Sequence, residues 1–231
     1  MKSKAVSEVF GNLLILVIIA ITISVMLSYG YPVIISGQEN VKIRNVVSSM
    51  VFTKEKMDVV STDVEPSAVL KFPPSGGELN VSNTCSVWVY VNGKSIDLPV
   101  NPGEILYTSG NRMIALELGG VLEKYGNKEW MIYPPKIKVF GNRIVVDIPV
   151  LIGSGSVGGY GIANIFLQYN STEVRTYSGT IKLVIKTNFP QVWKNYFSKE
   201  GFTATSSGNI VTAETSGSVT IVVHRIDILI Y

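Results

Sequence analysis

The chain has little of what small secreted domains, metalloproteins and nucleic-acid-binding proteins use. Charged residues make up 16% of its 231 residues, below the roughly 25% of an average soluble domain. Its one cysteine, Cys85, excludes a disulfide within the chain and so a small disulfide-stapled domain. Its one histidine, His224, would make an unusual metal site on its own. A formal net charge of +3 is too weak to indicate nucleic-acid binding.

Cys85 and His224 both lie in strand-like runs. Cys85 falls within 82–91 and His224 within the apolar run 219–231. We therefore expect Cys85 to be a small, buried apolar side chain, and His224 to lie on one face of a strand. A nucleophilic role for Cys85 would need a base and an orienting group nearby.

The most distinctive feature that is present is a long apolar run. Residues Val9–Ile35 include no charged side chain, and a bilayer core of about 30 Å needs about 20 apolar residues in a helix. The run exceeds the about 7–15 apolar residues of a cleaved secretory signal, and the stretch 29–32 after it is a poor cut site. Lys2 and Lys4 on its short side predict a cytoplasmic N-terminus and an external body.

Ser7 and Glu8 open this predicted helix. A serine oxygen and an acidic charge both suit the unpaired N–H groups of a first helical turn. A charge this close to hydrocarbon is nevertheless costly without a partner. Glu8 is therefore the residue of the segment for which a specific role, such as helix assembly, is most worth testing.

The sequence Lys4-Ala5-Val6-Ser7-Glu8-Val9-Phe10-Gly11, followed at once by the apolar run, resembles the class III signal of archaeal type IV pilin-like surface proteins. In that family a prepilin peptidase cuts on the cytoplasmic side, after a small residue preceded by a basic one. The helix then stays attached as a filament core or membrane anchor. The resemblance implies a cut between Ala5 and Val6, with Lys4 as the basic residue.

This resemblance departs from bacterial pilins at two positions. Alanine replaces the usual glycine before the cut, and Glu8 is third rather than fifth after it. The assembly role of the bacterial glutamate therefore does not transfer directly to Glu8. The motif covers about the first tenth of the chain, and the plain alternative is an uncleaved signal anchor.

A proline follows the apolar run. Pro32 lacks an N–H and its ring clashes with the preceding turn, so we expect a kink or break near Gly30–Pro32. Beyond it, apolar residues recur at helical spacing, which predicts an amphipathic helix over roughly Glu39–Val60 that ends before Pro66. This helix would pack on neighbouring subunits as a stalk, lie across the sheet of its own head, or do both.

From Ala68 onward, short alternating apolar runs are separated by turn signals, of which Asn92-Gly93 is the strongest hairpin signal. A short helix is expected over Pro190–Ser198. The expected strands lie at residues 87–91, 105–107, 113–118, 130–133, 136–140, 143–151, 164–169, 180–186, 209–213 and 219–231. So many short strands with glycine-rich turns predict a sandwich or jelly-roll-like head. Residues 117–120 with Pro134-Pro135 also resemble a block of archaeal pilin-like envelope proteins.

The expected fold class is α+β, with a long hydrophobic N-terminal α-helix followed by a mainly antiparallel β-sandwich or jelly-roll-like head. We divide the chain into four parts. These are a leader, residues 1–5; a transmembrane or filament-core helix, 6–36; an amphipathic helical stalk, 37–66; and a β-rich extracellular head, 67–231.

Two triplets match the N-glycosylation acceptor pattern. They begin at Asn80 and at Asn170, each near a turn or a strand end. An external head would make both of them accessible to glycosylation.

No catalytic motif stands out. The segment Gly153–Gly161 is predicted to be a flexible loop, since it lacks the terminal lysine and the helix of a phosphate loop. Its serines also lack the strand-to-helix turn of a nucleophile elbow. Carboxylate pairs, such as Asp58 with Asp63 or Glu117 with Glu123, are expected at scattered solvated positions. We therefore expect no enzymatic activity, cofactor or metal, and an extracytoplasmic enzyme is the weakest of three hypotheses.

The first hypothesis is a type IV pilin-like structural or cell-surface protein. It would be processed by a prepilin peptidase and held by its N-terminal helix, either in membrane lipid with the head outside or among other pilin-like subunits in an extracellular filament. The alternative is a singly anchored adhesin or binding module whose head recognises a surface, a glycan or DNA.

The tryptophans bear on that alternative. Trp88, Trp130 and Trp193 are expected mostly in the core, although an exposed subset could stack against sugars or single-stranded nucleic acid. Nucleic acid is not favoured as a partner, because no stripe of Lys and Arg accompanies them.

Overall fold

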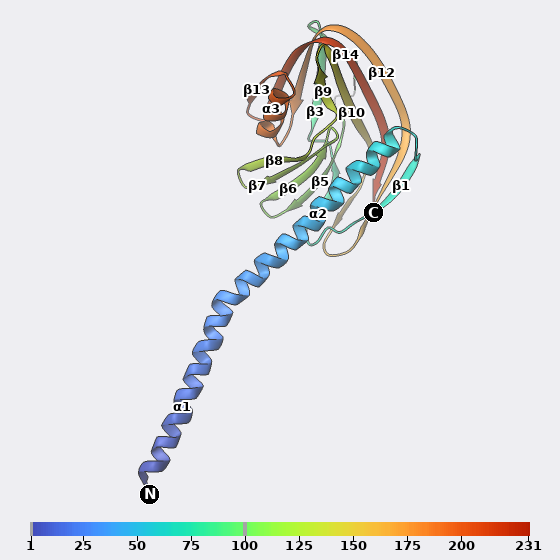
Figure 1. The fold of residues 1–231 in the computed structure, drawn as a ribbon. Helices are drawn as coiled ribbons and strands as arrows, with labels where there is room; N and C mark the ends of the chain where they lie inside the picture. Colours follow the sequence, from blue (N-terminus) through green and yellow to red (C-terminus); the bar gives the residue numbers. More distant parts are fainter. Residues whose placement is uncertain (1, 99–100) are drawn as a thin grey trace. The chain divides into compact units, whose positions relative to one another are not determined.

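The computed structural model describes residues 2–98 and 101–231, with side chains from Gly11 onward except at positions 32 and 36. The chain divides into two compact units, Met1–Asn45 and Val46–Tyr231. The fold is the expected one, a long apolar N-terminal helix followed by a mostly antiparallel β-rich domain of two sheets (Figure 1).

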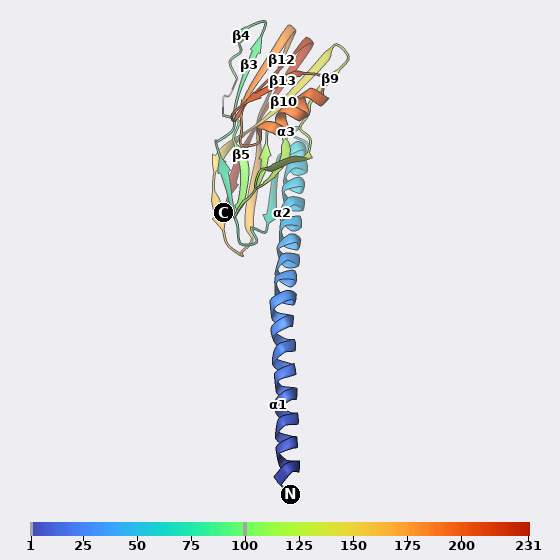
Figure 2. The ribbon, with the colours of Figure 1, turned by 90° about the vertical axis from the view of Figure 1, so that its left-hand side faces the viewer.

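The first unit is helical throughout its described residues. It consists of α1 (Lys2–Val25), a π-helical turn (Met26–Gly30) and the start of α2 (Tyr31–Ser61). Both views show an uninterrupted helix from α1 into α2 (Figure 1, Figure 2). Near Gly30–Pro32, where the sequence predicts a kink or break, the helix does not break but has a π-helical turn. The π-turn changes the backbone hydrogen-bond register just before the proline, whose missing N–H and ring would disturb a regular α-helix.

The C-terminal part of α2 belongs to the second unit. Val46, Met50, Met57 and Val60 recur at helical spacing and are buried. Of the two packing alternatives, the structure shows the helix packed within its own head from Val46 to Ser61. The helix ends before Pro66, as the sequence predicts.

The head contains two sheets. The larger has the order β4-β3-β12-β14-β10-β9, with β1 also paired to β12 and β13 to β14; the smaller has the order β11-β2-β5-β6-β7-β8. Among the described strands, only β10 and β14 pair in parallel. The larger sheet comprises β1 (Ser67–Phe72), β3 (Ser86–Val91), β4 (Lys94–Ser95), β9 (Ile137–Phe140), β10 (Arg143–Ser154), β12 (Ala163–Lys186), β13 (Thr203–Ser207) and β14 (Ile210–Ile230). The smaller comprises β2 (Glu78–Ser82), β5 (Glu104–Ser109), β6 (Arg112–Glu117), β7 (Gly120–Tyr125), β8 (Lys128–Tyr133) and β11 (Ser156–Gly158).

Strands β12 and β14 form a ladder that runs the length of the head (Figure 1). The sequence predicts two short strands in place of each, which is wrong. In β14 the buried residues are odd-numbered up to Val223 and even-numbered from Ile226 onward. Because strand side chains alternate between faces, the two halves of this strand bury opposite faces. A bulge between Tyr169 and Ser171 makes the matching change in β12.

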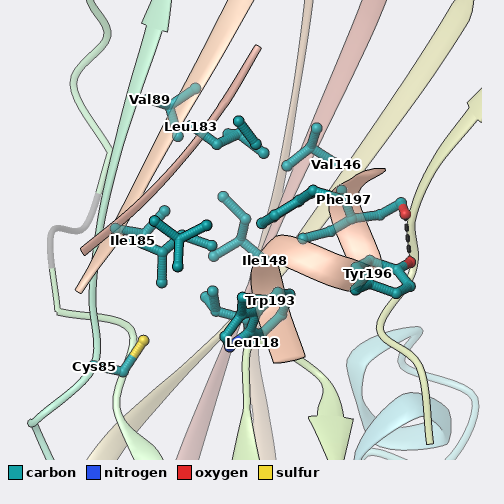
Figure 3. Close-up of a cluster of buried hydrophobic side chains, with 14 of the residues drawn as sticks. Cys85, Val89, Leu118, Val146, Ile148, Leu183, Ile185, Trp193, Tyr196 and Phe197 are labelled. Carbon is teal, nitrogen blue, oxygen red and sulfur yellow. Dashed lines mark hydrogen bonds between the residues drawn. The ribbon is translucent and has the colours of Figure 1, made fainter. Parts of the chain in front are cut away.

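The upper halves of the two long strands pack against α3 (Pro190–Lys199). Figure 3 shows Trp193 and Phe197 from this helix among Val146, Ile148 and Leu183 of the larger sheet. The rings of Trp193 and Phe197 stack with centroids 5.4 Å apart. The proline at the start of α3 suits a first helical turn, so this short helix confirms the sequence prediction.

The lower part of the head has a separate set of buried side chains. Phe72 of β1 and Tyr107 of β5 lie with ring centroids 6.2 Å apart, which joins the larger sheet to the smaller one. In β5, four consecutive residues from Glu104 to Tyr107 are buried, because the smaller sheet is covered on both faces. Buried residues therefore fill two layers rather than one.

The segment Gly153–Gly161 is not the flexible loop that the sequence predicts. Strand β10 continues to Ser154, and β11 pairs with β2. Gly153 has φ +150°, and a Cβ at this position would lie 1.8 Å from the carbonyl oxygen of Ile228. Its glycine therefore permits close approach of β14 rather than mobility.

Candidate functional site

The apolar helix is the most unusual surface of the molecule. Every side chain from Gly11 to Tyr31 is exposed, and Leu16 is 69% exposed. The helical run Gly11–Ser61 contains an 18-residue window of mean hydropathy 2.5 with none of it buried. By length and composition, this run is able to cross a membrane.

The two hydroxyl groups near the middle of this helix suit an apolar surrounding. Thr22 Oγ1 donates a hydrogen bond to the carbonyl of Ile18, and Ser24 Oγ donates to that of Ala20, each at 2.8 Å. Both hydroxyls are therefore satisfied within their own helix and need no water.

The predicted processing and assembly residues lie at the start of α1. The backbone at Lys4, Ala5, Val6 and Glu8 is helical, while their side chains are outside the described part of the structure. The cut after Ala5 and the role of Glu8 stay predictions.

The two glycosylation triplets have different surroundings. Asn80 lies in β2, opposite Leu106 of β5 on one side and Ser156 of β11 on the other, and is half-buried. Asn170 is exposed at the β12 bulge, where its Nδ2 donates to the Asp227 carboxylate at 3.1 Å. Asn170 is therefore the acceptor that the folded head presents to solvent.

A pair of carboxylates is buried where β5 meets β6. Glu104 and Glu117 are directly opposite each other in the antiparallel register, and both are fully buried. Trp193 Nε1 donates to Glu117 Oε1 at 2.7 Å, and Thr187 Oγ1 donates to Glu117 Oε2 at 3.0 Å. The Thr84 hydroxyl donates to Glu104 Oε1, while Oε2 has no hydrogen-bond partner among the described atoms.

Glu117 of this pair holds its proton tightly. Burial first, and the Glu104 charge second, raise the pKa of Glu117 to about 8, although hydrogen bonds from Thr187, Trp193 and Cys85 oppose the shift. Two carboxylates with opposed positions share a site in which one of them stays protonated at neutral pH. The arrangement links β5, β6, the end of β12 and α3 through hydrogen bonds.

Cys85 lies beside the carboxylate pair. It is fully buried, as the sequence predicts. Burial, then the charges of Glu117 and Glu104, raise the pKa of its thiol well above the ordinary value. A nucleophilic cysteine needs a lowered pKa, so this thiol has the opposite environment.

The carboxylate pairs that the sequence suggests are not the ones that the structure forms. Glu123 is buried and forms an ion pair with Arg112, whose Nη1 lies 3.1 Å from Glu123 Oε1. Asp58 lies 2.5 Å from Lys54 and 3.3 Å from Lys136. The expectation that these glutamates are solvated is therefore wrong for Glu117 and Glu123, because both point into covered faces of the smaller sheet.

His224 lies on one face of β14, as predicted, and is buried. Its Nδ1 is 2.8 Å from Thr172 Oγ1, and its Nε2 is 3.6 Å from Asp147 Oδ1. Thr172 Oγ1 also donates to the carbonyl of Ser61 at 3.2 Å. Thr172 therefore lies between the histidine and the end of α2, and the group joins three elements rather than activating a nucleophile.

The described residues contain no group of three or more His, Cys, Asp or Glu side chains that could hold a metal ion. Sequence reasoning missed Glu104 altogether. The sequence feature that could have indicated Glu104 is its position directly before the apolar strand residues 105–107. Its partner across the sheet, however, can be identified only from the strand register.

Within its described residues, the protein has one helix long and apolar enough to cross a membrane and a two-sheet β-rich head. The chain belongs to a family of unknown function (DUF7289), whose model matches residues 4–229. It is similar to an uncharacterized protein of Archaeoglobus fulgidus, with 26% identity over 222 residues that cover 86% of this chain and 83% of the relative. No solved structure matches. The family match includes both the apolar helix and the head.

Proposed function

We propose that this protein is a type IV pilin-like structural or cell-surface protein, anchored or assembled through its N-terminal helix. One observation carries the proposal, namely the wholly exposed apolar surface from Gly11 to Tyr31 in a chain with a β-rich head. Water is a poor solvent for such a surface, so lipid or other apolar helices are its natural surroundings.

The shape of this helix supports packing against like helices. Ala20, Ser24 and Ser28 recur every four residues and line a shallow groove of about 350 Å³ on the helix surface. Small residues at this spacing let two helix backbones approach closely in an apolar medium. A filament core or a membrane-bound oligomer would both use this groove.

The resemblance of residues 4–11 to a class III signal supports processing by a prepilin peptidase and an external head. The cut would follow Ala5 and leave the apolar helix attached. We include in the proposal that the protein is not an enzyme, because its buried carboxylates, thiol and histidine serve as hydrogen-bonded links between elements.

The first experiment is mass spectrometry of the full chain extracted from membranes of an archaeal host. We expect an N-terminus at Val6, and an uncut chain in the Ala5→Leu variant, because a bulky residue replaces the small one before the cut. Lys2→Ala is the matched control and leaves processing unchanged. An intact N-terminus in the unaltered chain would contradict the pilin-like assignment.

Negative-stain microscopy of the cell surface then separates the two forms of the proposal. Filaments that bind an antibody against the head indicate a pilin subunit, whereas membrane-bound protein without filaments indicates an anchor. The Ser24→Leu variant fills the groove and is expected to reduce assembly while leaving membrane association intact.

A singly anchored binding module is the second candidate function. A specific observation favours it: Trp88 and Tyr90 in β3 are half-exposed on the solvent face of the larger sheet. Core packing does not require aromatic side chains at these positions.

A further inference from the structure

Four neighbouring strands of the larger sheet share one solvent-facing surface at the upper end of the head. In register across β3, β12, β14 and β13, one row consists of Trp88, Val184, Thr212 and Thr205. The next row consists of Tyr90, Lys182, Glu214 and Thr203. We call these two rows the aromatic–hydroxyl face.

Alternation along each strand places these side chains outward. In β3 the intervening Val87 and Val89 are buried, and in β14 so are Val211 and Ala213. Directly opposed residues of neighbouring strands lie on the same face. The two aromatic rings therefore share a face with the threonines, across about 14 Å for four strands spaced about 4.8 Å apart.

The face is hollowed at the end away from the aromatic residues. A groove of about 460 Å³ is lined by Thr203, Thr205, Thr212, Glu214, Thr215 and Ser216. Alternation along β13 and β14 places four hydroxyls, those of Thr203, Thr205, Thr212 and Ser216, on this face with the Glu214 carboxylate, while Thr215 faces the other side. The Ser216 hydroxyl lies 2.8 Å from that of Thr180 on β12, which continues the run of hydroxyls toward β3.

This chemistry suits a neutral saccharide. Aromatic ring faces cover the apolar C–H face of a sugar ring, while hydroxyls and a carboxylate hydrogen-bond its hydroxyl groups. Binding pockets of a few hundred Å³ combine such apolar surface with a few well-placed polar groups. Lys182 stands directly opposite Glu214, so the two rows carry no net charge and offer little attraction to a phosphate backbone.

We propose that the aromatic–hydroxyl face binds a neutral oligosaccharide. Trp88 and Tyr90 stack on sugar rings, and Glu214 with the threonines of the groove hydrogen-bonds sugar hydroxyls. The site lies wholly in the second unit. It therefore stands whether or not the apolar helix is cleaved or assembles into filaments.

The test uses the full chain in octaethylene glycol monododecyl ether, a detergent without a sugar headgroup that would compete. Maltohexaose, cellohexaose and mannohexaose are titrated separately by calorimetry and by tryptophan fluorescence. We expect at least one of them to bind and to change the tryptophan emission; in Trp130→Ala that change comes from Trp88, since Trp193 is fully buried. Binding of none of the three by the folded chain would overturn the proposal.

Three variants locate the site. Trp88→Ala is expected to weaken binding more than about tenfold, as removal of a central aromatic contact does. Glu214→Gln keeps the side-chain shape, and is expected to weaken binding roughly tenfold through loss of a charged hydrogen bond. Trp130→Ala removes an exposed tryptophan of the smaller sheet, and is expected to leave the affinity unchanged.

Two further outcomes would overturn the proposal even if a saccharide bound. One is equal weakening by Trp88→Ala and Trp130→Ala, which would place the site elsewhere. The other is tighter binding of a twenty-nucleotide oligothymidine that competes with the sugar, which would make the face a nucleic-acid surface. Far-ultraviolet circular dichroism of each variant confirms that the head remains folded.

Discussion

The two units of this protein use the same apolar residue types in opposite ways. In the first, leucine and isoleucine side chains from Leu13 onward are exposed to the surroundings. In the second, isoleucines such as Ile221 and Ile228 are buried, and so are the carboxyl groups of Glu104 and Glu117. Composition alone therefore does not decide burial. What decides it is whether a segment has a partner layer within its own chain.

The largest effect is expected when charges are introduced into the exposed apolar helix. Replacing both Leu16 and Ile19 with arginine should prevent membrane insertion, because a charge at a helix centre costs roughly 3 kcal/mol on insertion scales. Alkaline carbonate extraction of membranes measures the effect. Val174→Arg, a substitution at an exposed apolar residue of the head, is the matched control and should remain in the membrane fraction.

The contribution of buried apolar residues to the stability of the head is tested at α3. Trp193→Ala should lower the free energy of unfolding of the head by about 3–5 kcal/mol, because it leaves a cavity and removes a donor from Glu117. Urea unfolding followed by circular dichroism measures the change. Trp130→Ala removes the same side chain type at a half-exposed position and should cost much less.

A smaller effect is expected where β10 approaches β14. Gly153→Ala should cost about 1–3 kcal/mol, because its Cβ would meet the Ile228 carbonyl and its φ of +150° is unfavourable for alanine. Thermal unfolding measures the loss. Gly161→Ala, where a Cβ has open space, should be nearly neutral. Equal stability of the two variants would restore the flexible-loop interpretation of this segment.

The pH dependence of stability sharpens the contrast between exposed and buried carboxylates. The folded state keeps a proton on Glu117, with its pKa of about 8, that the unfolded state releases at a lower pH. The unfolded state then binds fewer protons, so stability falls as pH rises from about 5 through about 8, by at most roughly 1.4 kcal/mol per pH unit.

Glu117→Gln should remove most of this slope. The variant therefore becomes more stable relative to the unaltered protein as the pH rises from 5 to 9. Urea unfolding at pH 5, 7 and 9 measures the difference. Glu55→Gln changes an exposed glutamate of α2 and should leave the slope as it is. A slope that persists in Glu117→Gln would assign the proton to another group.

Much of this architecture follows from local sequence. An uncharged run is enough to predict the apolar helix, and the turn at Asn92-Gly93 connects β3 to β4 as expected. The long strands were missed because mostly polar stretches, residues 170–179 and 214–218, interrupt the apolar pattern. A polar stretch reads as a loop between two strands, whereas here the ladder of β12 and β14 continues through it.

The candidate sites were less predictable, because they depend on residues that register brings together. Glu104 and Glu117 are thirteen positions apart and meet only because β5 and β6 pair as they do. Trp88 shares a face with the threonines of β13 only because two strands, β12 and β14, pair between them. The sequence identifies the tryptophans as candidates for stacking, but not the hydroxyls that share a face with Trp88.

The shared ladder of β12 and β14 has a consequence for how the head comes apart. Both buried layers are built on the same two strands, one on each side of them. If these two strands separate from one buried layer, the other layer loses the strands on which it packs. Amide protons of this ladder should therefore exchange with solvent only when the whole head opens, which makes the domain all-or-none despite its two separate interiors.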